Sequence, residues 1–329
     1  MDAIRCEGLS RTYGAFEALK ALDLTVPTGA IFGFLGRNGA GKTTTIRLLT
    51  GLAQPTTGRA WVNGVEAQVG DGAASHQFGY LPQAPAFYNW MSPIDYLDYA
   101  GRLFRIDSNE RQSRIEELLA LVGLEKAARR PIEGFSGGMK RRLGLAQALI
   151  HGPRVLILDE PMAGMDPAGR RDVIELLDSL RGEVTVFFSS HILADVDRVC
   201  DTIGIIHEGE LLLTAARDEL LARYATNAIQ LEFDRESRPS VAAFAPHIEA
   251  QPWASGVTAD NGGLRVVVTD TAVAKINHIR PGFQPPPRKA KADKKKLLIK
   301  MVKYIPAMSS RCLRRVIPCH DRFISPLTS

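Results

Sequence analysis

The sequence has few cysteines and no long apolar run. Four cysteines are scattered over 329 residues, which is too few for a disulfide framework. No apolar stretch approaches the ~18–20 residues that a membrane-spanning helix needs. The N-terminus also lacks the charged start and apolar segment of a signal peptide. We therefore expect a cytoplasmic protein with no membrane span of its own.

Acidic residues are scarce at the end of the chain. Residues 277–329 hold 13 Lys or Arg and 2 Asp or Glu, whereas residues 1–276 hold 28 and 34. The net charge of +5 therefore combines a mildly acidic body with a strongly basic end. A basic excess favours nucleic-acid or membrane partners, but only the last segment carries it.

Short apolar segments alternate with helical patterns along the body of the chain. Buried strands that alternate with helices predict an α/β fold, in which helices cover both faces of a parallel sheet. The expected strands are Ala21–Val26, Ala30–Leu35, Arg154–Leu158, Val184–Phe188 and Thr202–His207. The expected helices are Ser136–Ile150 and Pro167–Leu180, with a helix-rich stretch at Pro93–Val122 and a hairpin around Asn63-Gly64.

These patterns divide the chain into three parts. Residues 1–220 form the main domain, with a helical insertion at about 84–150. Residues 225–279 form a small α+β module, with elements expected at Asn227–Asp234, Ser240–Ala250, Leu264–Thr269 and Thr271–Ile279. Prolines and like charges predict a flexible basic tail at 280–329.

A glycine-rich loop follows the strand Ala30–Leu35. Residues 36–43 fit the pattern G-x-x-x-x-G-K-[ST], between a strand and a helix as this motif requires. Its glycines allow backbone N–H groups to converge on phosphate oxygens, Lys42 adds a positive charge, and the Thr43 hydroxyl suits Mg²⁺. The candidate ATP-binding residues here are Gly36, Arg37, Asn38, Gly39, Ala40, Gly41, Lys42, Thr43 and Thr44.

Two adjacent acids follow the apolar strand Arg154–Leu158. Open parallel sheets bind ligands at the edge where their strands end, and a buried strand does not end in two acids without a cation. Asp159 is therefore a candidate Mg²⁺ residue, acting through water, and Glu160 is placed to accept a proton from an attacking water. The alternative is a solvated acidic turn.

The segment Phe135-Ser136-Gly137-Gly138-Met139-Lys140-Arg141 resembles the signature of ATP-binding cassette (ABC) proteins, whose commonest form is Leu-Ser-Gly-Gly-Gln. It departs from that form at Phe135 and Met139 but keeps the hydroxyl and two unhindered N–H groups that suit a phosphate. Taken alone, Ser136 would be only a helix N-cap.

Four further positions resemble this family in order and spacing. The resemblance implies that Tyr13 stacks on adenine and that Gln83 contacts Mg²⁺ and water. It also implies that Asp166 lies in the D-loop of a dimer and that His191 contacts the γ-phosphate. Ser136, Gly137 and Gly138 complete the expected ATP site.

The resemblance also implies a mechanism that needs two cassettes. Ser136 and Gly138 of one cassette cap the γ-phosphate that Lys42 of the other holds, while Glu160 polarises water and His191 stabilises the transition state. The second cassette is another copy of this chain or a different ABC domain. ATP and Mg²⁺ are the expected cofactors, and closure is transmitted through the region after Gln83 to membrane subunits.

Among ABC proteins the chain resembles ATPases of ABC-2-type exporters, which move drugs, lipids or polysaccharides. This resemblance rests on Gly79–Gly101, on Phe188–Leu193 and on the small module after one cassette. It implies a separate transmembrane subunit and a position on the inner face of the cell membrane. Substrate contacts would lie in that other chain.

Two alternatives belong to other classes. A soluble ABC ATPase acting on ribosomes or nucleic acid would suit the basic tail, but such relatives carry two cassettes, coiled coils or zinc sites. A degenerate cassette that only binds ATP is disfavoured because Gln83, Glu160 and His191 are intact. We therefore expect no nucleic-acid partner.

The basic tail has three interpretations of its own. It is a solvated end, a segment that binds anionic lipids, or the product of a shifted reading frame beginning at about Asn277. None of the motifs lies in it.

Overall fold

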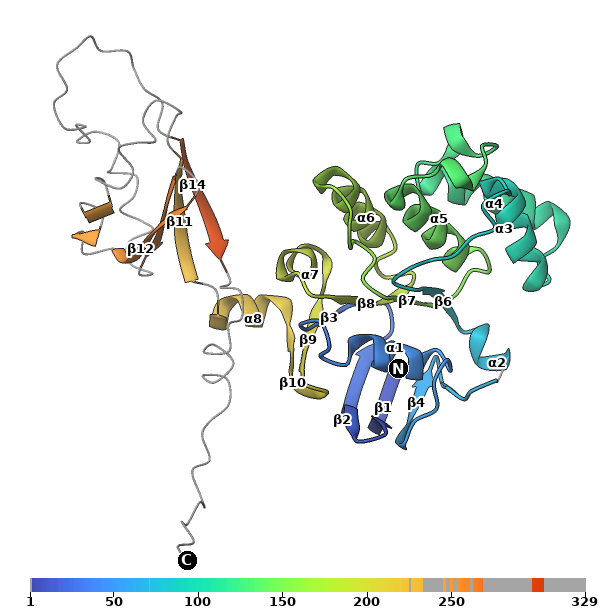
Figure 1. The fold of residues 1–329 in the computed structure, drawn as a ribbon, viewed down its shortest axis with the longest axis horizontal. Helices are drawn as coiled ribbons and strands as arrows, with labels where there is room; N and C mark the ends of the chain where they lie inside the picture. Colours follow the sequence, from blue (N-terminus) through green and yellow to red (C-terminus); the bar gives the residue numbers. More distant parts are fainter. Residues whose placement is uncertain are drawn as a thin grey trace, which may run out of the picture. The chain divides into compact units, whose positions relative to one another are not determined.

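The computed structural model (Figure 1) describes residues 2–70, 72–224, 226–232, 245–246, 249–250, 254–260, 263–268 and 298–304. The chain divides into two compact units, Met1–Glu219 and Leu220–Ser329. The motifs identified in the sequence all lie in the first unit, and the division falls within helix α8 (Arg217–Tyr224).

The first unit is organised around a six-stranded sheet of order β10-β9-β3-β8-β7-β6. Strands β3, β6, β7, β8 and β9 are parallel, and β10 pairs with β9 in the antiparallel direction at one edge. Their bounds are β3 Ile31–Leu35, β6 Phe78–Leu81, β7 Val155–Leu158, β8 Thr185–Ser190, β9 Thr202–His207 and β10 Glu210–Ala216. Every residue of β3, β7 and β8 is buried, which confirms the predicted α/β fold with a parallel sheet.

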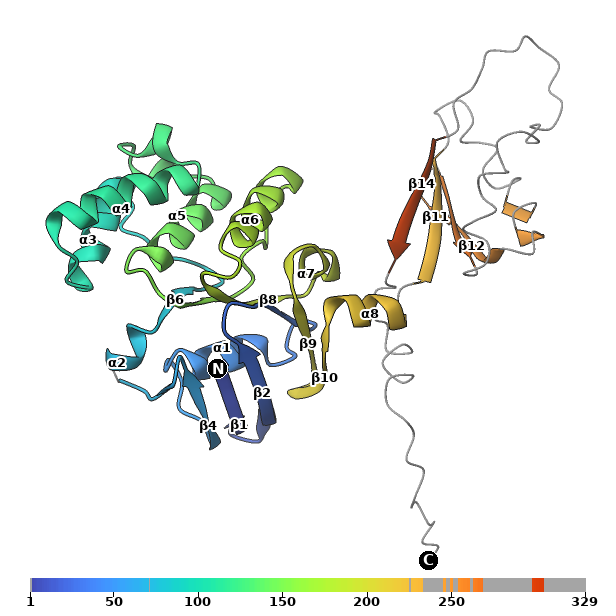
Figure 2. The ribbon, with the colours of Figure 1, turned by 180° about the vertical axis from the view of Figure 1, so that it is seen from behind.

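Helices cover both faces of this sheet (Figures 1 and 2). Helices α5 and α6 lie over one face, and α1 lies over the other. The helices of this unit are α1 Lys42–Leu49, α2 Gly72–Ser75, α3 Pro93–Leu103, α4 Ser108–Leu121, α5 Gly137–Leu149, α6 Pro167–Ser179 and α7 Leu193–Val199, with single 3₁₀ turns at Glu125–Ala127 and Ile132–Gly134. Ser92 and Asp95 form a capping box at the start of α3, with Pro93 as its first residue.

A second, antiparallel sheet of order β2-β1-β4-β5 completes the unit. Its strands are β1 Asp2–Tyr13, β2 Phe16–Pro27, β4 Thr57–Val62 and β5 Val65–Glu66. Asn63 and Gly64 both have positive φ, at 49° and 81°, as a tight hairpin turn requires. The expected strand Ala21–Val26 is the end of β2. It belongs to this second sheet because polar and apolar residues alternate along β2, which leaves one face exposed.

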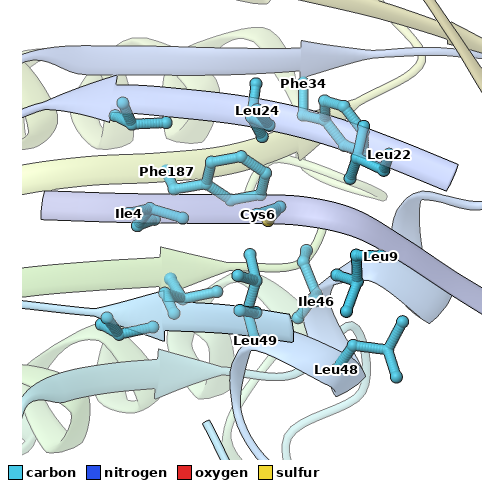
Figure 3. Close-up of a cluster of buried hydrophobic side chains, with 14 of the residues drawn as sticks. Ile4, Cys6, Leu9, Leu22, Leu24, Phe34, Ile46, Leu48, Leu49 and Phe187 are labelled. Carbon is cyan, nitrogen blue, oxygen red and sulfur yellow. The ribbon is translucent and has the colours of Figure 1, made fainter. Parts of the chain in front are cut away.

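The main core lies between the two sheets (Figure 3). Strands β1 and β2 contribute Ile4, Cys6, Leu9, Leu22 and Leu24 to it, and α1 contributes Ile46, Leu48 and Leu49. Phe187 stacks on Phe32 with ring centroids 5.5 Å apart, and both side chains are fully buried. Each such side chain contributes about 1.5–3 kcal/mol relative to exposure, so this core fixes α1 and the loop before it.

The second unit contains an antiparallel sheet of order β12-β13-β11-β14. Its strands are β11 Thr226–Glu232, β12 Ala254–Asp260, β13 Gly263–Val268 and β14 Leu298–Tyr304. Strands β11 and β13 correspond to the expected Asn227–Asp234 and Leu264–Thr269, whereas Thr271–Ile279 and most of Ser240–Ala250 lie outside the described residues. The division of the chain at 220, 225 and 280 stays a prediction.

Strand β14 lies within the segment for which the sequence predicts a flexible tail. It pairs with β11 over seven residues, from Leu298↔Glu232 to Tyr304↔Thr226. The surrounding prolines and lysines dominate the composition, but residues 298–304 alone (LIKMVKY) are rich in β-branched, aromatic and other apolar residues. The rest of the tail lies outside the described residues. Among the described helices, none is long and apolar enough to cross a membrane.

Candidate active site

The sequence motifs converge at one edge of the parallel sheet. Strands β3, β8, β7 and β6 are neighbours in that order. Gly36 follows β3, His191 follows β8, Asp159 follows β7, and Gln83 lies just beyond β6. Because parallel strands all end at the same edge, four segments that are far apart in the sequence are brought together there.

The loop after β3 favours glycine at three positions, at Gly39 and Gly41 because of positive φ and at Gly36 and Gly41 because a side chain would not fit. Gly39 and Gly41 have φ of 81° and 107°, which L side chains rarely adopt. A Cβ on Gly36 would lie 2.6 Å from the Ile206 carbonyl oxygen, and one on Gly41 would lie 2.8 Å from that of Ala18. The loop therefore has the compact backbone that a phosphate group requires for close approach.

Lys42 is the first residue of α1, and 5% of its side chain is exposed. Its Nζ donates hydrogen bonds to the carbonyl oxygens of Gly36 (2.8 Å) and Arg37 (3.2 Å). It also lies 3.2 Å from Oε1 of Glu160. A buried ammonium at the start of a helix, held inside a glycine loop, fits a phosphate chain.

Asp159 and Glu160 follow β7 and are both buried. The Ser189 hydroxyl donates a hydrogen bond to Oδ1 of Asp159 (2.7 Å) and accepts one from the backbone N–H of Glu160 (2.9 Å). The backbone N–H of Asp159 donates to the Leu81 carbonyl (2.9 Å). Three neighbouring strands thus position this pair of acids, and the interpretation of a solvated acidic turn is wrong.

The Glu160 carboxylate lies between two functional groups. Its Oε1 is 3.2 Å from Lys42 Nζ, and its Oε2 is 2.9 Å from Nδ1 of His191. Since an ionised carboxylate can only accept, Nδ1 of His191 donates this hydrogen bond. Only 8% of the Glu160 side chain is exposed, against 41% for His191. Lys42, Asp159, Glu160 and His191, all predicted from the sequence, therefore form one cluster.

Two residues of this cluster are absent from the predicted set, Ser189 and Arg141. The Arg141 guanidinium donates to the backbone carbonyls of Glu160 and, at 2.8 Å, of Gln83. Ser189 lies two positions before His191 at the end of β8, so its position in the sequence could have indicated that it belongs to the site. Arg141 ends the signature-like segment on α5, but that segment does not indicate its contacts with Glu160 and Gln83, which lie 19 and 58 positions away in the sequence.

The other predicted residues have local partners. The Ser136 hydroxyl caps α5 by accepting from the Met139 N–H (3.2 Å), and Gly137 and Gly138 form the first turn of that helix. Asp166 caps α6 by accepting from the Gly169 N–H (3.0 Å). These capping contacts lie within one chain, so they do not test the roles of Ser136 and Asp166 in a dimer, which stay predictions.

Tyr13 and the expected Mg²⁺ residues are more open. The Tyr13 side chain is exposed at the end of β1, and the Arg11 guanidinium lies 4.4 Å from the centre of its ring. Gln83 is exposed, and Thr43 and Thr44 are partly buried. Within the described part of the chain, no group of three or more His, Cys, Asp or Glu is arranged to hold a metal ion. Thr43, Gln83 and Asp159 would therefore need phosphate oxygens to complete a Mg²⁺ shell.

A glycine loop with a buried lysine, beside paired acids at the end of parallel strands, defines a P-loop nucleotide triphosphatase. The family model described as ABC transporter matches residues 19–163. The uncharacterized ABC transporter ATP-binding protein YxlF of Bacillus subtilis (strain 168) is 41% identical over 72% of this chain and 81% of its own length. The bacitracin transport ATP-binding protein BcrA of Bacillus licheniformis is 40% identical over 70% of this chain and 74% of its own length.

A solved structure, the ATP-binding subunit of an ABC transporter, matches with a TM-score of 0.62 and 29% identity, covering 68% of this chain and 93% of that one. The chain belongs to the ABC transporter family, and it is an ATP-binding and ATP-hydrolysing subunit of that family. This confirms the resemblance inferred from the signature segment.

Proposed function

We propose that this subunit powers export of a drug, lipid or polysaccharide-like molecule through a separate membrane subunit, from the inner face of the cell membrane. The relative named for bacitracin transport supports an exporter. The observation that carries the catalytic part of the proposal is the position of Glu160 between Lys42 and His191.

In the proposed reaction, Lys42 and the loop Gly36–Gly41 hold the β- and γ-phosphates of ATP. Glu160 accepts a proton from the attacking water. His191, which contacts the carboxylate through Nδ1, lies next to the γ-phosphate. Thr43, Gln83 and Asp159 would hold Mg²⁺, which neutralises phosphate charge when it is bound.

The proposed site is completed by a second cassette, from another copy of this chain or a paired ABC domain. Tyr13 stacks on adenine, with Arg11 on one face of its ring. Ser136 and Gly138 contact the ATP that the second cassette holds, and Asp166 lies at the contact between the two. Ser136 and Asp166 are exposed, as an intermolecular role requires, and Gly138 is partly buried.

Glu160→Gln tests the catalytic part. The amide keeps the volume and hydrogen-bonding capacity of the side chain but cannot accept a proton from water. We expect kcat to fall by about 10²–10⁴-fold, while the affinity for ATP is retained and ATP traps a dimer on a gel-filtration column. The control is Glu175→Gln, which changes an exposed glutamate of α6. Undiminished turnover in Glu160→Gln would show that Glu160 is not the base.

An aromatic patch after Gln83 is the proposed docking surface for the membrane subunit. Trp90, Tyr88 and Tyr99 are exposed by 73%, 50% and 38%. Their rings lie against one another, with centroids 6.2 Å apart for Tyr88 and Trp90 and 5.8 Å apart for Tyr88 and Tyr99. Clustered exposed aromatic residues are typical of protein interfaces.

Co-purification tests this surface and the separate partner together. We expect the full chain to be recovered with membranes, and Trp90→Ala to lose this association while keeping its affinity for ATP. Leu52→Ser, which changes an exposed apolar residue of a different loop, is the matched control. Recovery with ribosomes or nucleic acid alone, and with no membrane protein, would refute the transporter proposal.

A further inference from the structure

Arg141 connects three functional segments of the same cassette. It lies on α5, five residues after the Ser136 that begins the helix. Its guanidinium donates through Nη1 to the backbone carbonyl of Glu160 and through Nη2 to that of Gln83 (2.8 Å). One planar side chain therefore links three segments: α5, which we call the signature helix because Ser136 begins it, the proposed base Glu160, and the loop that follows β6.

The backbone at Glu160 depends on such contacts. Its φ is +47°, in the left-handed region that non-glycine residues adopt only at an energetic cost. A conformation of this kind persists only where the surroundings hold it. Here the Ser189 hydroxyl holds the N–H of Glu160, and Arg141 holds its C=O. The direction of the carboxylate follows from this clamped peptide.

The Arg141 guanidinium is half-buried next to Glu160 and Asp159. Burial lowers the pKa of its guanidinium, whereas the charges of Glu160 and Asp159 raise it. A half-buried cation needs its hydrogen bonds to offset lost hydration. The neighbouring Arg142 is also half-buried, but it donates to the carbonyls of Val122 (3.1 Å) and Gly123 (3.4 Å) at the end of α4.

We propose that Arg141 is a positioning residue that couples the signature helix to the catalytic site of its own cassette. It holds Glu160 in the orientation that water activation requires. It also fixes the position of the loop after β6, which contains Gln83, relative to Glu160. Because Ser136 begins the same helix, engagement of Ser136 with the second cassette's ATP fixes the helix that carries Arg141. This inference rests on the proposed function, and it links the two ATP sites of the proposed dimer.

The first test compares Arg141→Met and Arg141→Lys with Arg142→Met in the full chain. Met fills the space of the stem but cannot donate, and Lys keeps the charge without the planar fork. We expect Arg141→Met to lower kcat by about 10²-fold, the effect of a small misplacement of a catalytic group. The KM for ATP stays near the wild-type value, cooperativity with ATP is lost, and Arg141→Lys restores only part of kcat. Arg142→Met lowers the melting temperature but keeps kcat and cooperativity.

The second test is a double-mutant cycle with Glu160→Gln. If Arg141 acts through Glu160, then adding Arg141→Met to Glu160→Gln lowers the residual rate little further, so the two effects are not additive. ATP still binds to the double variant, as followed with a fluorescent ATP analogue.

The outcomes separate the inference from the proposed function. If Glu160→Gln lowers kcat but Arg141→Met and Arg141→Lys do not, the inference is overturned and the proposed base stands. Fully additive losses, or full recovery of kcat by Arg141→Lys, also overturn the inference, because they indicate a general structural or charge role. If Glu160→Gln leaves turnover intact, the proposed base itself is refuted.

Discussion

We predict that the low pKa of His151 makes the free energy of unfolding fall in mild acid. Its ring stacks on that of Phe104, with centroids 4.0 Å apart and an interplanar angle of 7°. Its Nε2 donates to the Phe78 carbonyl (3.1 Å), which leaves Nδ1 as the unprotonated nitrogen, buried without a hydrogen-bond partner. Burial, aided by the nearby charges of His76 and Arg114, lowers the pKa of His151 from 6.5 to about 4. The stack joins the end of α3 and the end of α5 to the edge strand β6.

The size of the effect follows from these two pKa values. Between pH 6.5 and about 4 the unfolded chain binds a proton that the folded chain does not, so the free energy of unfolding falls as the pH falls through this window. Between pH 7.5 and pH 5 the difference corresponds to at most about 2 kcal/mol. Because His151 is only partly buried, solvent screening reduces this to about 1 kcal/mol.

Urea unfolding of the wild type and of His151→Gln, followed by helical circular dichroism at both pH values, measures this effect. Gln keeps a donor for the Phe78 carbonyl but does not titrate in this range. Carboxylates and other histidines contribute equally to both proteins, so the variant should lose about 1 kcal/mol less than the wild type on acidification. Equal losses in the two proteins would refute the argument that His151 is held neutral.

Two further predictions concern side chains and space around the site. Ser189→Ala removes the hydroxyl that holds Glu160, so we expect a loss of about 1–3 kcal/mol in urea unfolding together with a lower kcat; an unchanged kcat would contradict the proposed clamp. Gly79→Ala places a Cβ 1.9 Å from the Ala148 carbonyl oxygen, and forcing β6 and α5 apart should cost about 1–3 kcal/mol or more. Gly134→Ala, whose Cβ would meet open space, is its control, and melting temperatures that fall alike would contradict the prediction.

The parallel sheet was predictable because its strands are continuous apolar runs. Strands β3, β7 and β8 are buried along their whole length, so a local pattern is enough to locate them. Strand β1 was not predicted, because its residues alternate less regularly and its pairings with β2 and β4 contain register shifts. Strand β14 was missed because the composition around it outweighs seven apolar and basic residues.

The site was predictable to the extent that its residues follow strands directly. Gly36, Asp159 and His191 directly follow β3, β7 and β8, and Lys42 ends the loop that Gly36 begins. The edge of a parallel sheet is where its strands end, so these positions predict a common site. The contacts of Arg141 join residues that are 19 and 58 positions apart, through the packing of α5 against the sheet. Such contacts arise only from tertiary packing, so a sequence motif does not predict them.

The structure also removes a conflict between two interpretations of Ser136. As an N-cap, its hydroxyl accepts from the Met139 N–H, which uses an oxygen lone pair and leaves the hydroxyl proton as a donor. A phosphate oxygen needs that proton, so the capping role and the proposed contact with the second cassette's ATP are compatible. Capping holds the first turn of α5 in place before ATP is met, and the N–H groups of that turn favour an anion. The same capped helix carries Arg141 one turn further on, so a fixed Ser136 also means a fixed clamp on Glu160.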